Sequence, residues 1–167
     1  MISYKLIKES ELKELSDMRR VIHAQTYRGI HPDEMIDNYD YERFMEMDRK
    51  RLKQDNCYYL FICENDTKIG YLLVKEEVPS KYKDFAFYLG SLHLLPEYQK
   101  RGYGKVSFKY ISSLCQELGY SKFYCQCNPH NKNAMEFYHH MGGSIGCEDT
   151  GHKEKIEDAV YFEFSVV

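Results

Sequence analysis

Hydrophobic and polar positions alternate at the start of the chain and then change to helical spacing. The alternation from Ile2 to Leu6 predicts an opening β-strand. The apolar residues that follow recur at helical intervals: Leu12, Leu15, Met18 and Ile22. A helix is therefore expected from near Ser10 to just before Gly29, where a turn-rich segment begins. A looser apolar face predicts a second helix from near Tyr41 to Leu52.

The middle of the chain has the pattern of β-strands. Residues 58–63 and 68–74 are rich in aromatic and aliphatic side chains, and they flank the polar turn at 64–67. This arrangement predicts a β-hairpin. Residues 85–95 are nearly all apolar, and Pro96 ends the run. Such a run is typical of a central strand that is buried on both faces.

Helical spacing returns after a turn with two glycines. A helix is expected from about Gly104 to Glu117, with Gly119 as its stop. The remaining expected elements are a short helix that ends at Gly142 and three strands, at residues 123–127, 144–148 and 159–166. The order predicts an α/β fold: one domain over residues 1–167, with a mixed β-sheet flanked by about four helices. The strands at 85–95 and 123–127 should form a central parallel pair with a right-handed crossover.

Composition narrows the function classes. The chain has 167 residues, a formal net charge of -3 and a sequence pI of about 6.2. This balance argues against broad binding of nucleic acid, which needs a surplus of Lys and Arg to replace counterions on phosphate. No apolar run approaches the ~20 residues that span a bilayer, so no membrane association is expected. The chain opens directly on a strand-like alternation, and we expect a cytoplasmic protein.

The cysteines and histidines do not predict a metal site. The six cysteines lack the paired spacing of zinc ligands, and a cytoplasmic location favours reduced thiols. Cys125 and Cys127 are two residues apart in a strand, so both should point to one face. Buried thiols are the simpler interpretation, and a reactive or metal-binding role is the alternative. His139 and His140 are adjacent on a helix and point apart, so they cannot chelate one ion.

The segment from Gln99 to Gly104 joins the apolar run to the following helix. Two glycines leave room for close approach of a diphosphate, and the helix N-terminus adds positive charge. Lys100, Arg101 and Lys105 add further charge. The segment lacks the Gly-Lys-Ser/Thr ending of a P-loop. An ordinary tight turn with solvated basic residues is the alternative to a diphosphate site, and a nucleotide-binding module is one kind of protein that would use such a site.

Two motifs resemble signatures of the GNAT superfamily of N-acetyltransferases. Residues 99–104 have the pattern Q-x-x-G-x-G, and residues 131–142 have the pattern N-x-x-A-x-x-F-Y-x-x-M-G. Gly143 stands where the family usually has Phe. The order of the expected elements is also similar over nearly the whole chain. The resemblance implies that acetyl-CoA is the acyl donor and that no metal is needed.

The resemblance also implies which residues bind acetyl-CoA. The pantetheine arm would contact backbone groups of the central strand and a family asparagine: Leu92, His93, Leu94 and Asn131. The pyrophosphate would lie on the glycine segment: Gln99, Lys100, Arg101, Gly102, Tyr103, Gly104 and Lys105. Tyr138 matches the tyrosine that protonates the departing thiolate. A phenol with a pKa of about 10 can donate to such a leaving group, but the same spacing also suits a core aromatic residue.

No residue stands out as the general base. Many relatives use a Glu on the central strand or the next one, where this chain has Tyr88 and Gln126. His93 projects opposite to its neighbours and has a suitable pKa, although a lone His in an apolar strand is usually structural. Asp33 and Glu34 could instead bind a cationic substrate or serve as helix-capping residues. A water chain or an amine that arrives neutral would need no base.

The resemblance implies an N-acetyltransferase that uses a primary amine of a small molecule or peptide as acceptor. The amine would attack the thioester directly in a ternary complex. The alternative is an acyl-CoA-binding regulatory domain without turnover, because the usual carboxylate base is missing. Dimers are frequent in the family, so a homodimer is compatible with the sequence.

Overall fold

The strands form one mixed sheet in the computed structural model, which describes residues 1–166. Within these residues the strands pair in the order β1-β2-β3-β4-β5-β7-β6. Their bounds are β1 Ile2–Leu6, β2 Cys57–Glu64, β3 Thr67–Glu76, β4 Phe87–Leu94, β5 Lys122–Cys127, β6 Ser144–Asp149 and β7 Ala159–Ser165. The predicted hairpin is confirmed as the antiparallel pair β2–β3, and the predicted parallel pair is β4–β5.

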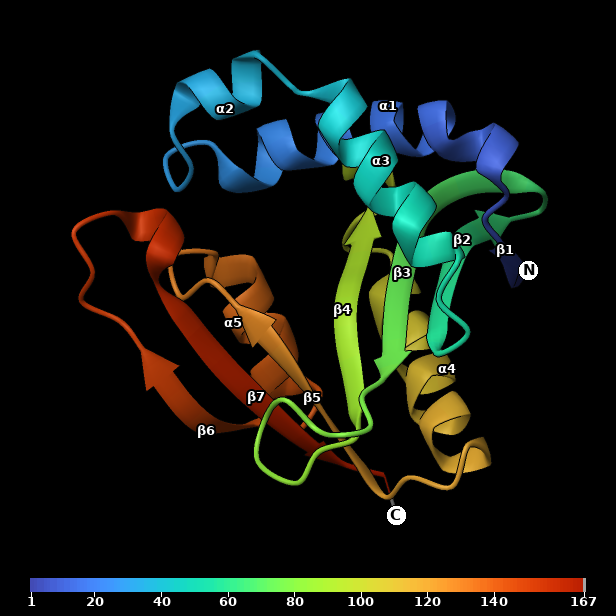
Figure 1. Cartoon of the computed structure of the whole chain (residues 1–167), viewed down its shortest axis with the longest axis vertical. Helices are drawn as coiled ribbons and strands as arrows, with labels where there is room; N and C mark the ends of the chain where they lie inside the picture. The colour runs from blue at the N-terminus through green and yellow to red at the C-terminus, as the bar shows by residue number, and fades with distance from the viewer. Residues whose placement is uncertain (167) are drawn as a thin grey trace.

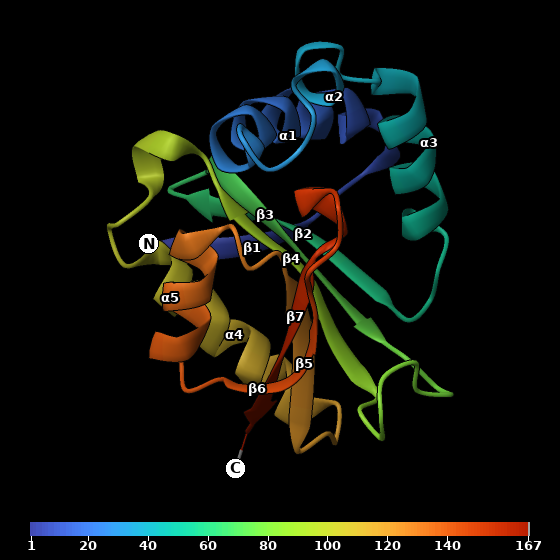
Figure 2. The same ribbon diagram turned by 90° about the vertical axis from the view of Figure 1, so that its left-hand side faces the viewer.

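The α-helices cover the two faces of the sheet (Figure 2). The described residues form α1 Leu12–Tyr27, α2 Asp33–Asp37, α3 Tyr41–Leu52, α4 Tyr103–Glu117 and α5 Lys132–His140. Short 3-10 helices are η1 Glu9–Glu11, η2 Pro96–Tyr98 and η3 Lys155–Glu157. The expected four helices are present, and α2 is an additional short one that follows Pro32. Within residues 1–166, none of the helices is both long and apolar enough to cross a bilayer.

The predicted apolar stripe of α1 packs on one face of the sheet. Leu12, Leu15, Met18 and Ile22 are buried against Tyr59, Phe61, Tyr71 and Leu73 of β2 and β3. Buried Arg19 on α1 forms a bidentate ion pair with Asp48 on α3, with nitrogen–oxygen distances of 2.7 and 2.9 Å. Because both charges are buried, losing one partner would leave the other uncompensated. The pair therefore fixes α1, whose last turn borders the cleft described below.

The opposite face carries the larger core. Phe108, Ile111 and Cys115 of α4 and Tyr138 of α5 are buried against residues of β2 to β5 and β7. Val106, which the apolar pattern of α4 would place inward, is 47% exposed. Ser107 lies inward instead, where its hydroxyl accepts a hydrogen bond from Tyr4 at 3.2 Å.

Strands β4 and β5 are paired over a short distance and then diverge (Figure 1). Among residues 1–166, the register pairs in this parallel ladder are Tyr88 with Tyr124 and Leu89 with Cys125. The expectation that the run 85–95 is buried on both faces is therefore wrong for its second half. Residues 90–94 are half-buried, because β5 does not continue beside them. Phe85 precedes the strand and closes a turn, with its N–H donating to the carbonyl of Tyr82 at 3.0 Å.

A β-bulge sets the side-chain directions in β4. Leu73 pairs with Ser91 and Val74 pairs with Leu89, so Gly90 is an extra residue in β4. A Cβ at Gly90 would lie 3.2 Å from Cδ2 of Leu73, which leaves little room for a larger residue. Because the extra residue reverses the alternation, Leu92 and Leu94 lie on the same face as Leu89. His93 consequently points to the face covered by α1.

Candidate active site

A cleft of about 820 Å³ opens where β4 and β5 diverge. We call it the β4–β5 cleft. Its walls are the last turn of α1, the second half of β4, the segment from Gln99 to Lys105, the end of β5 and the first turns of α5. We call the segment from Gln99 to Lys105 the glycine turn. The unpaired side of β4 gives this cleft a wall of open backbone groups, which suits an extended, amide-containing ligand.

The glycine turn has the backbone geometry of an anion site. Lys100 and Gly102 have positive φ angles of 59° and 85°. Positive φ angles within a turn can direct successive backbone N–H groups toward one concave side. Helix α4 begins at Tyr103, and among the described residues no side chain caps its first turn. The open N–H groups and the helix dipole together favour a negatively charged group such as a diphosphate.

Most of the predicted turn residues border the cleft, but two side chains do not. Lys100, Gly102, Gly104 and Lys105 line it together with Gln99. Two other side chains of the segment have partners elsewhere. The guanidinium of Arg101 lies 5.5 Å from the ring centre of Tyr98, and the hydroxyl of Tyr103 donates to Glu64. Arg101 and Tyr103 can therefore offer the cleft backbone N–H groups rather than side chains.

Gln99 fixes the turn in place. Its side-chain amide donates to the backbone carbonyl of Leu94 at 2.9 Å and to the side chain of Gln25 at 3.0 Å. These hydrogen bonds join the end of β4, the start of the turn and the last turns of α1. The structure thus gives Gln99 a positioning role, in addition to its place in the lining of the cleft.

The predicted residues of β4 lie where the strand borders the cleft. Leu92, His93 and Leu94 all line it. The imidazole of His93 packs against Tyr71, with ring centres 5.2 Å apart, and against His23 at 6.0 Å. Burial and the nearby charge of Arg19 lower the pKa of His93 to about 4. The ring is therefore neutral at physiological pH, but it is a weak base.

Asn131 is the N-cap of α5 and lines the cleft. Its side-chain oxygen accepts a hydrogen bond from the N–H of Ala134 at 3.2 Å. This contact orients the side chain, and the amide nitrogen remains able to donate to a ligand. Asn131 therefore has a structural role that is compatible with the predicted contact to the pantetheine arm.

Tyr138 is buried at the edge of the same cleft. Its ring packs against Phe162 and Phe164, with ring centres 5.6 and 6.0 Å away. Burial raises the pKa of Tyr138 well above its usual range, and the neighbouring thiols of Cys125 and Cys127 add to this. The phenol is therefore protonated at any physiological pH, and burial also makes it a weaker acid than a free phenol. The core role and the proton-donor role are compatible in this position.

The two cysteines of β5 are buried on one face, as predicted. Burial raises the pKa of Cys127 to about 11, and it raises the pKa of Cys125 further. Both groups are thus thiols rather than thiolates at neutral pH, which disfavours them as nucleophiles. Among residues 1–166, no cluster of three or more His, Cys, Asp or Glu side chains is arranged to hold a metal ion.

The other base candidates have different surroundings. Asp33 is exposed and accepts a hydrogen bond from Arg28 at 3.2 Å, and Glu34 is exposed in the first turn of α2. Burial raises the pKa of Tyr88 to about 12. Gln126 lines the cleft but carries no ionisable group. The described residues thus bring no carboxylate into the cleft lining except Glu136.

The sequence did not identify the part of the cleft wall that α1 supplies. Ile22, Gln25, Thr26 and Tyr27 line the cleft from the last two turns of this helix. Tyr27 stacks on His31, with ring centres 4.3 Å apart. The apolar stripe predicted that this helix packs on the sheet, but helical spacing gives no signal for which end borders a cavity.

Comparisons with known proteins agree with this geometry. The family model described as Acetyltransferase (GNAT) family matches residues 17–142, which is most of the chain. A sequence search of curated proteins found no significant match. The fold is similar to that of PaiA N-acetyltransferase from Thermoplasma acidophilum in complex with coenzyme A. That match has a TM-score of 0.80 and 20% identity, and it covers 99% of both chains.

Two further solved structures have the same fold. An acetyltransferase from Thermus thermophilus matches with a TM-score of 0.77 and 14% identity, over 99% of this chain and 97% of that one. The structure of yncA from Salmonella typhimurium, with acetyl-CoA as its cofactor, matches with a TM-score of 0.70 and 12% identity, over 100% and 95% of the two chains. These findings favour an acetyltransferase over a silent acyl-CoA-binding domain. With a family model matched over most of its residues and a fold shared along its whole length, this protein belongs to the GNAT family of acetyltransferases.

Proposed function

We propose that the protein transfers an acetyl group from acetyl-CoA to a primary amine by direct attack. One observation carries the proposal. The β4–β5 cleft has a turn with the backbone geometry of an anion site on one wall and the buried phenol of Tyr138 on another. In a thioester with a diphosphate at its far end, the diphosphate would bind the turn and the sulfur would accept a proton from the phenol. Acetyl-CoA is the acyl-donor substrate, and its pyrophosphate would lie on the N–H groups of the glycine turn.

The reaction follows from the groups in the cleft. The amine nitrogen attacks the thioester carbonyl carbon, so that a C–N bond forms and the C–S bond breaks. Open backbone N–H groups of β4 would polarise the carbonyl oxygen. The phenol of Tyr138 donates its proton to the departing sulfur, and solvent returns a proton to the phenolate. The attacking nitrogen loses its extra proton to water.

The cleft supplies no strong base, so the amine must arrive neutral. His93 is neutral above about pH 4, but with so low a pKa the imidazole is too weak a base to take a proton from an alkylammonium ion. The rate should therefore depend on the fraction of neutral amine in solution. Because both thiols near Tyr138 are protonated, direct transfer is favoured over an acetyl-cysteine intermediate.

The test is release of CoA from acetyl-CoA in the presence of a panel of amines, with the acetylated product identified by mass spectrometry. The panel contains amino acids, peptides with free N-termini, aminoglycosides and polyamines. We expect amine-dependent CoA release and a product that is heavier by one acetyl group. Tight binding of acetyl-CoA with no acetylated product across the panel would contradict the proposal and support the silent domain.

A further inference from the structure

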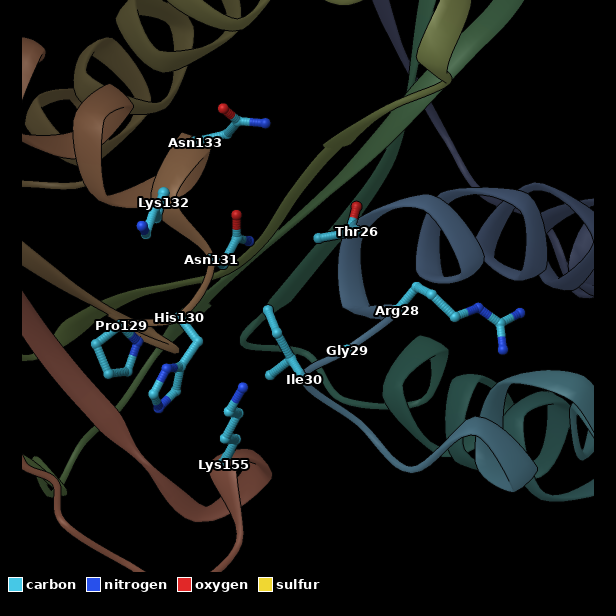
Figure 3. A pocket seen from close by; sticks show the side chains of 10 residues that line it. All are labelled: Thr26, Arg28, Gly29, Ile30, Pro129, His130, Asn131, Lys132, Asn133 and Lys155. Carbon is cyan, nitrogen blue, oxygen red and sulfur yellow. The ribbon is translucent and has the colours of Figure 1, made fainter.

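A second cavity lies beside the β4–β5 cleft, and Figure 3 shows the side chains that line it. Its volume is about 540 Å³, which is in the range of small-molecule sites. Thr26, Asn131 and Asn133 line both cavities. The rest of its wall comes from the loop after α1, the loop before α5 and η3 in the β6–β7 connection. We call this cavity the basic pocket.

The charge of the basic pocket differs from that of the chain as a whole. The chain has a net charge of -3, but the ionisable side chains that line the pocket are Arg28, His130, Lys132 and Lys155. Among the described residues, no Asp or Glu belongs to this lining. A concentration of one sign of charge in a concave site attracts a ligand of the opposite sign.

Two of these basic groups already have acidic partners. Arg28 donates to Asp33 at 3.2 Å and to Asp37 at 2.8 Å, and its guanidinium points away from the pocket (Figure 3). The Nε2 atom of His130 lies 2.8 Å from the carboxylate of Asp158. That carboxylate also accepts from the N–H of His152 at 3.0 Å, so Asp158 is engaged with partners and does not line the pocket.

Lys155 has no such partner. It takes part in none of the ion pairs found within residues 1–166, and its ammonium group points into the space between His130 and Ile30 (Figure 3). Glu154 and Glu157 are its neighbours in the chain, but neither lines the pocket. Lys132, at the start of α5, also lines the pocket and is unpaired among the described residues.

The position of Lys155 is fixed by the loop before α5. The side-chain amide of Asn128 donates to the backbone carbonyl of Lys155 at 2.7 Å. The contact between His130 and Asp158 joins the same two segments a short distance away. These two hydrogen bonds hold the β6–β7 connection against the end of β5, so the lysine is presented to the pocket by an ordered backbone.

We infer that the basic pocket binds an oxyanion on the acceptor, with Lys155 as its counter-charge. This inference rests on the proposed function and specifies its substrate class: an amine that also carries a carboxylate or a phosphate. A polyamine would place a second positive charge near Lys155, where the two charges repel each other. The size of the pocket suits a small molecule or the end of a short peptide.

Matched pairs of amines test the substrate class. Each pair keeps a primary amine and changes one other group: an amino acid and its carboxamide for the carboxylate, and O-phosphoethanolamine and ethanolamine for the phosphate. Because the pKa of the amine also differs within a pair, kcat/KM is compared per neutral amine. In at least one pair, we expect kcat/KM for acetylation to be about tenfold higher for the anionic member than for its neutral partner. A charge-assisted hydrogen bond would provide a difference of this size. Which pair responds distinguishes a carboxylate from a phosphate. Equal values in both pairs, or preference for spermidine, would overturn the inference.

Substitution of Lys155 tests the residue. We expect Lys155→Gln to reduce the preference for the anionic amine by about tenfold, through KM, and Lys155→Glu to shift the preference toward spermidine. Lys153→Gln is the matched control, because this lysine lies in the same loop but does not line the pocket. A preference that survives in Lys155→Gln would contradict the assignment.

A binding measurement separates this inference from the proposed function. Calorimetric titration of the CoA-loaded protein with the same pairs of amines requires no turnover. Stronger binding of the anionic member that is lost in Lys155→Gln would support the assignment of the basic pocket as an oxyanion site. If no amine were acetylated in addition, only the proposed function would be contradicted. The Kd of CoA itself should be unchanged in Lys155→Gln. An increase in that Kd would place Lys155 on a phosphate of CoA and overturn the inference.

Discussion

The glycine turn and the basic pocket both present positive charge to a cavity, but they do so with different groups. In the turn, the charge comes largely from backbone N–H groups, which the positive φ angles of Lys100 and Gly102 and the start of α4 orient. In the pocket, it comes from side chains on segments that are far apart in the sequence. A site built from backbone groups should keep its affinity when side chains are replaced and lose it when the backbone conformation changes. A site built from side chains should lose its affinity when those side chains are replaced.

The largest effect is expected at Tyr138, which lines the β4–β5 cleft. Tyr138→Phe removes the proton donor but retains the ring, so we expect kcat to fall by about a hundredfold while the Kd of CoA is unchanged. Stopped-time assays of CoA release and calorimetry measure the two quantities. Tyr124→Phe is the control, because this hydroxyl donates to Glu77 at 2.6 Å on the other face of the sheet. If Tyr138→Phe retained the full kcat at every pH, the proton-donor role would be wrong.

A smaller effect is expected from a change in the conformation of the glycine turn. Gly102→Val places a β-branched residue at a φ of 85°, where such side chains are strained by about 2 kcal/mol. We expect the Kd of CoA to rise by about thirtyfold, because the N–H groups lose their alignment. Gly119→Val provides the same strain at a φ of 88° at the end of α4, away from the cleft.

Calorimetry and urea unfolding separate the two glycine variants. Both variants should lose a similar free energy of unfolding, but only Gly102→Val should lose affinity for CoA. Arg101→Gln should change the Kd by less than about threefold, because its side chain stacks on Tyr98 outside the cleft. A larger effect of Arg101→Gln than of Gly102→Val would show that side chains, and not the backbone, bind the diphosphate.

The support of the turn by Gln99 should have a moderate effect. Gln99→Leu removes the hydrogen bonds to Leu94 and Gln25, each worth about 1 kcal/mol, so we expect the Kd of CoA to rise by about fivefold. The free energy of unfolding should fall by a similar amount. Lys100→Gln, at the next position and with an exposed side chain, separately measures the effect of a lost charge, because Gln99→Leu leaves the charge unchanged. An unchanged Kd in Gln99→Leu would show that the turn holds its conformation without this support.

The smallest effect is expected at His93, and it concerns pH. Because the pKa of His93 is lowered to about 4, the ring is already neutral at pH 5 and does not change charge as the pH rises further. We expect kcat/KM to rise by about tenfold per pH unit up to the pKa of the amine, as the neutral amine becomes available. His93→Gln should leave this profile in place and change the rate by less than about threefold. A separate decrease in kcat/KM below about pH 6.5 that is absent in His93→Gln would identify His93 as the base.

The same lowered pKa has a consequence for stability. The pKa values of His23 and His93 are lowered to about 3 and about 4, so the folded chain resists protonation that the unfolded chain accepts below about pH 6.5. The free energy of unfolding should therefore fall as the pH decreases from 6.5 toward 4, by roughly 1 kcal/mol per pH unit for each histidine. Urea unfolding of His93→Gln should show a shallower decrease. An unchanged slope would show that His93 is solvated in the folded protein.

The glycine turn was predictable because its determinants are local. Two glycines after an apolar strand and before an amphipathic helix define both the conformation and its position in the fold. The hairpin and the helix at 41–52 were predictable for the same reason, since each depends on side-chain periodicity within one segment. Asn131 and Tyr138 were found through the resemblance, because an N-cap and an apolar stripe alone do not distinguish a binding site from a core.

The divergence of β4 and β5 was not predictable from periodicity. An apolar strand that lines a cleft has the same pattern as one that is buried on both faces, and the bulge at Gly90 reverses its alternation without a distinct signal. The basic pocket was not predictable either, because Thr26 at the end of α1, His130 before α5 and Lys155 in the β6–β7 connection meet only in the folded chain. The sequence allows Asp33 as a ligand for a cationic substrate, but its contact with Arg28 depends on the fold.

Titration of the protein with acetyl-CoA by calorimetry is the most direct test of the central claim, that the β4–β5 cleft binds this donor through the glycine turn. We predict one binding site per chain at micromolar affinity, competition by CoA, no competition by ATP, and weaker binding in Gly102→Val but not in Gly119→Val. No measurable binding at high micromolar concentrations, or displacement by ATP rather than by CoA, would contradict the account.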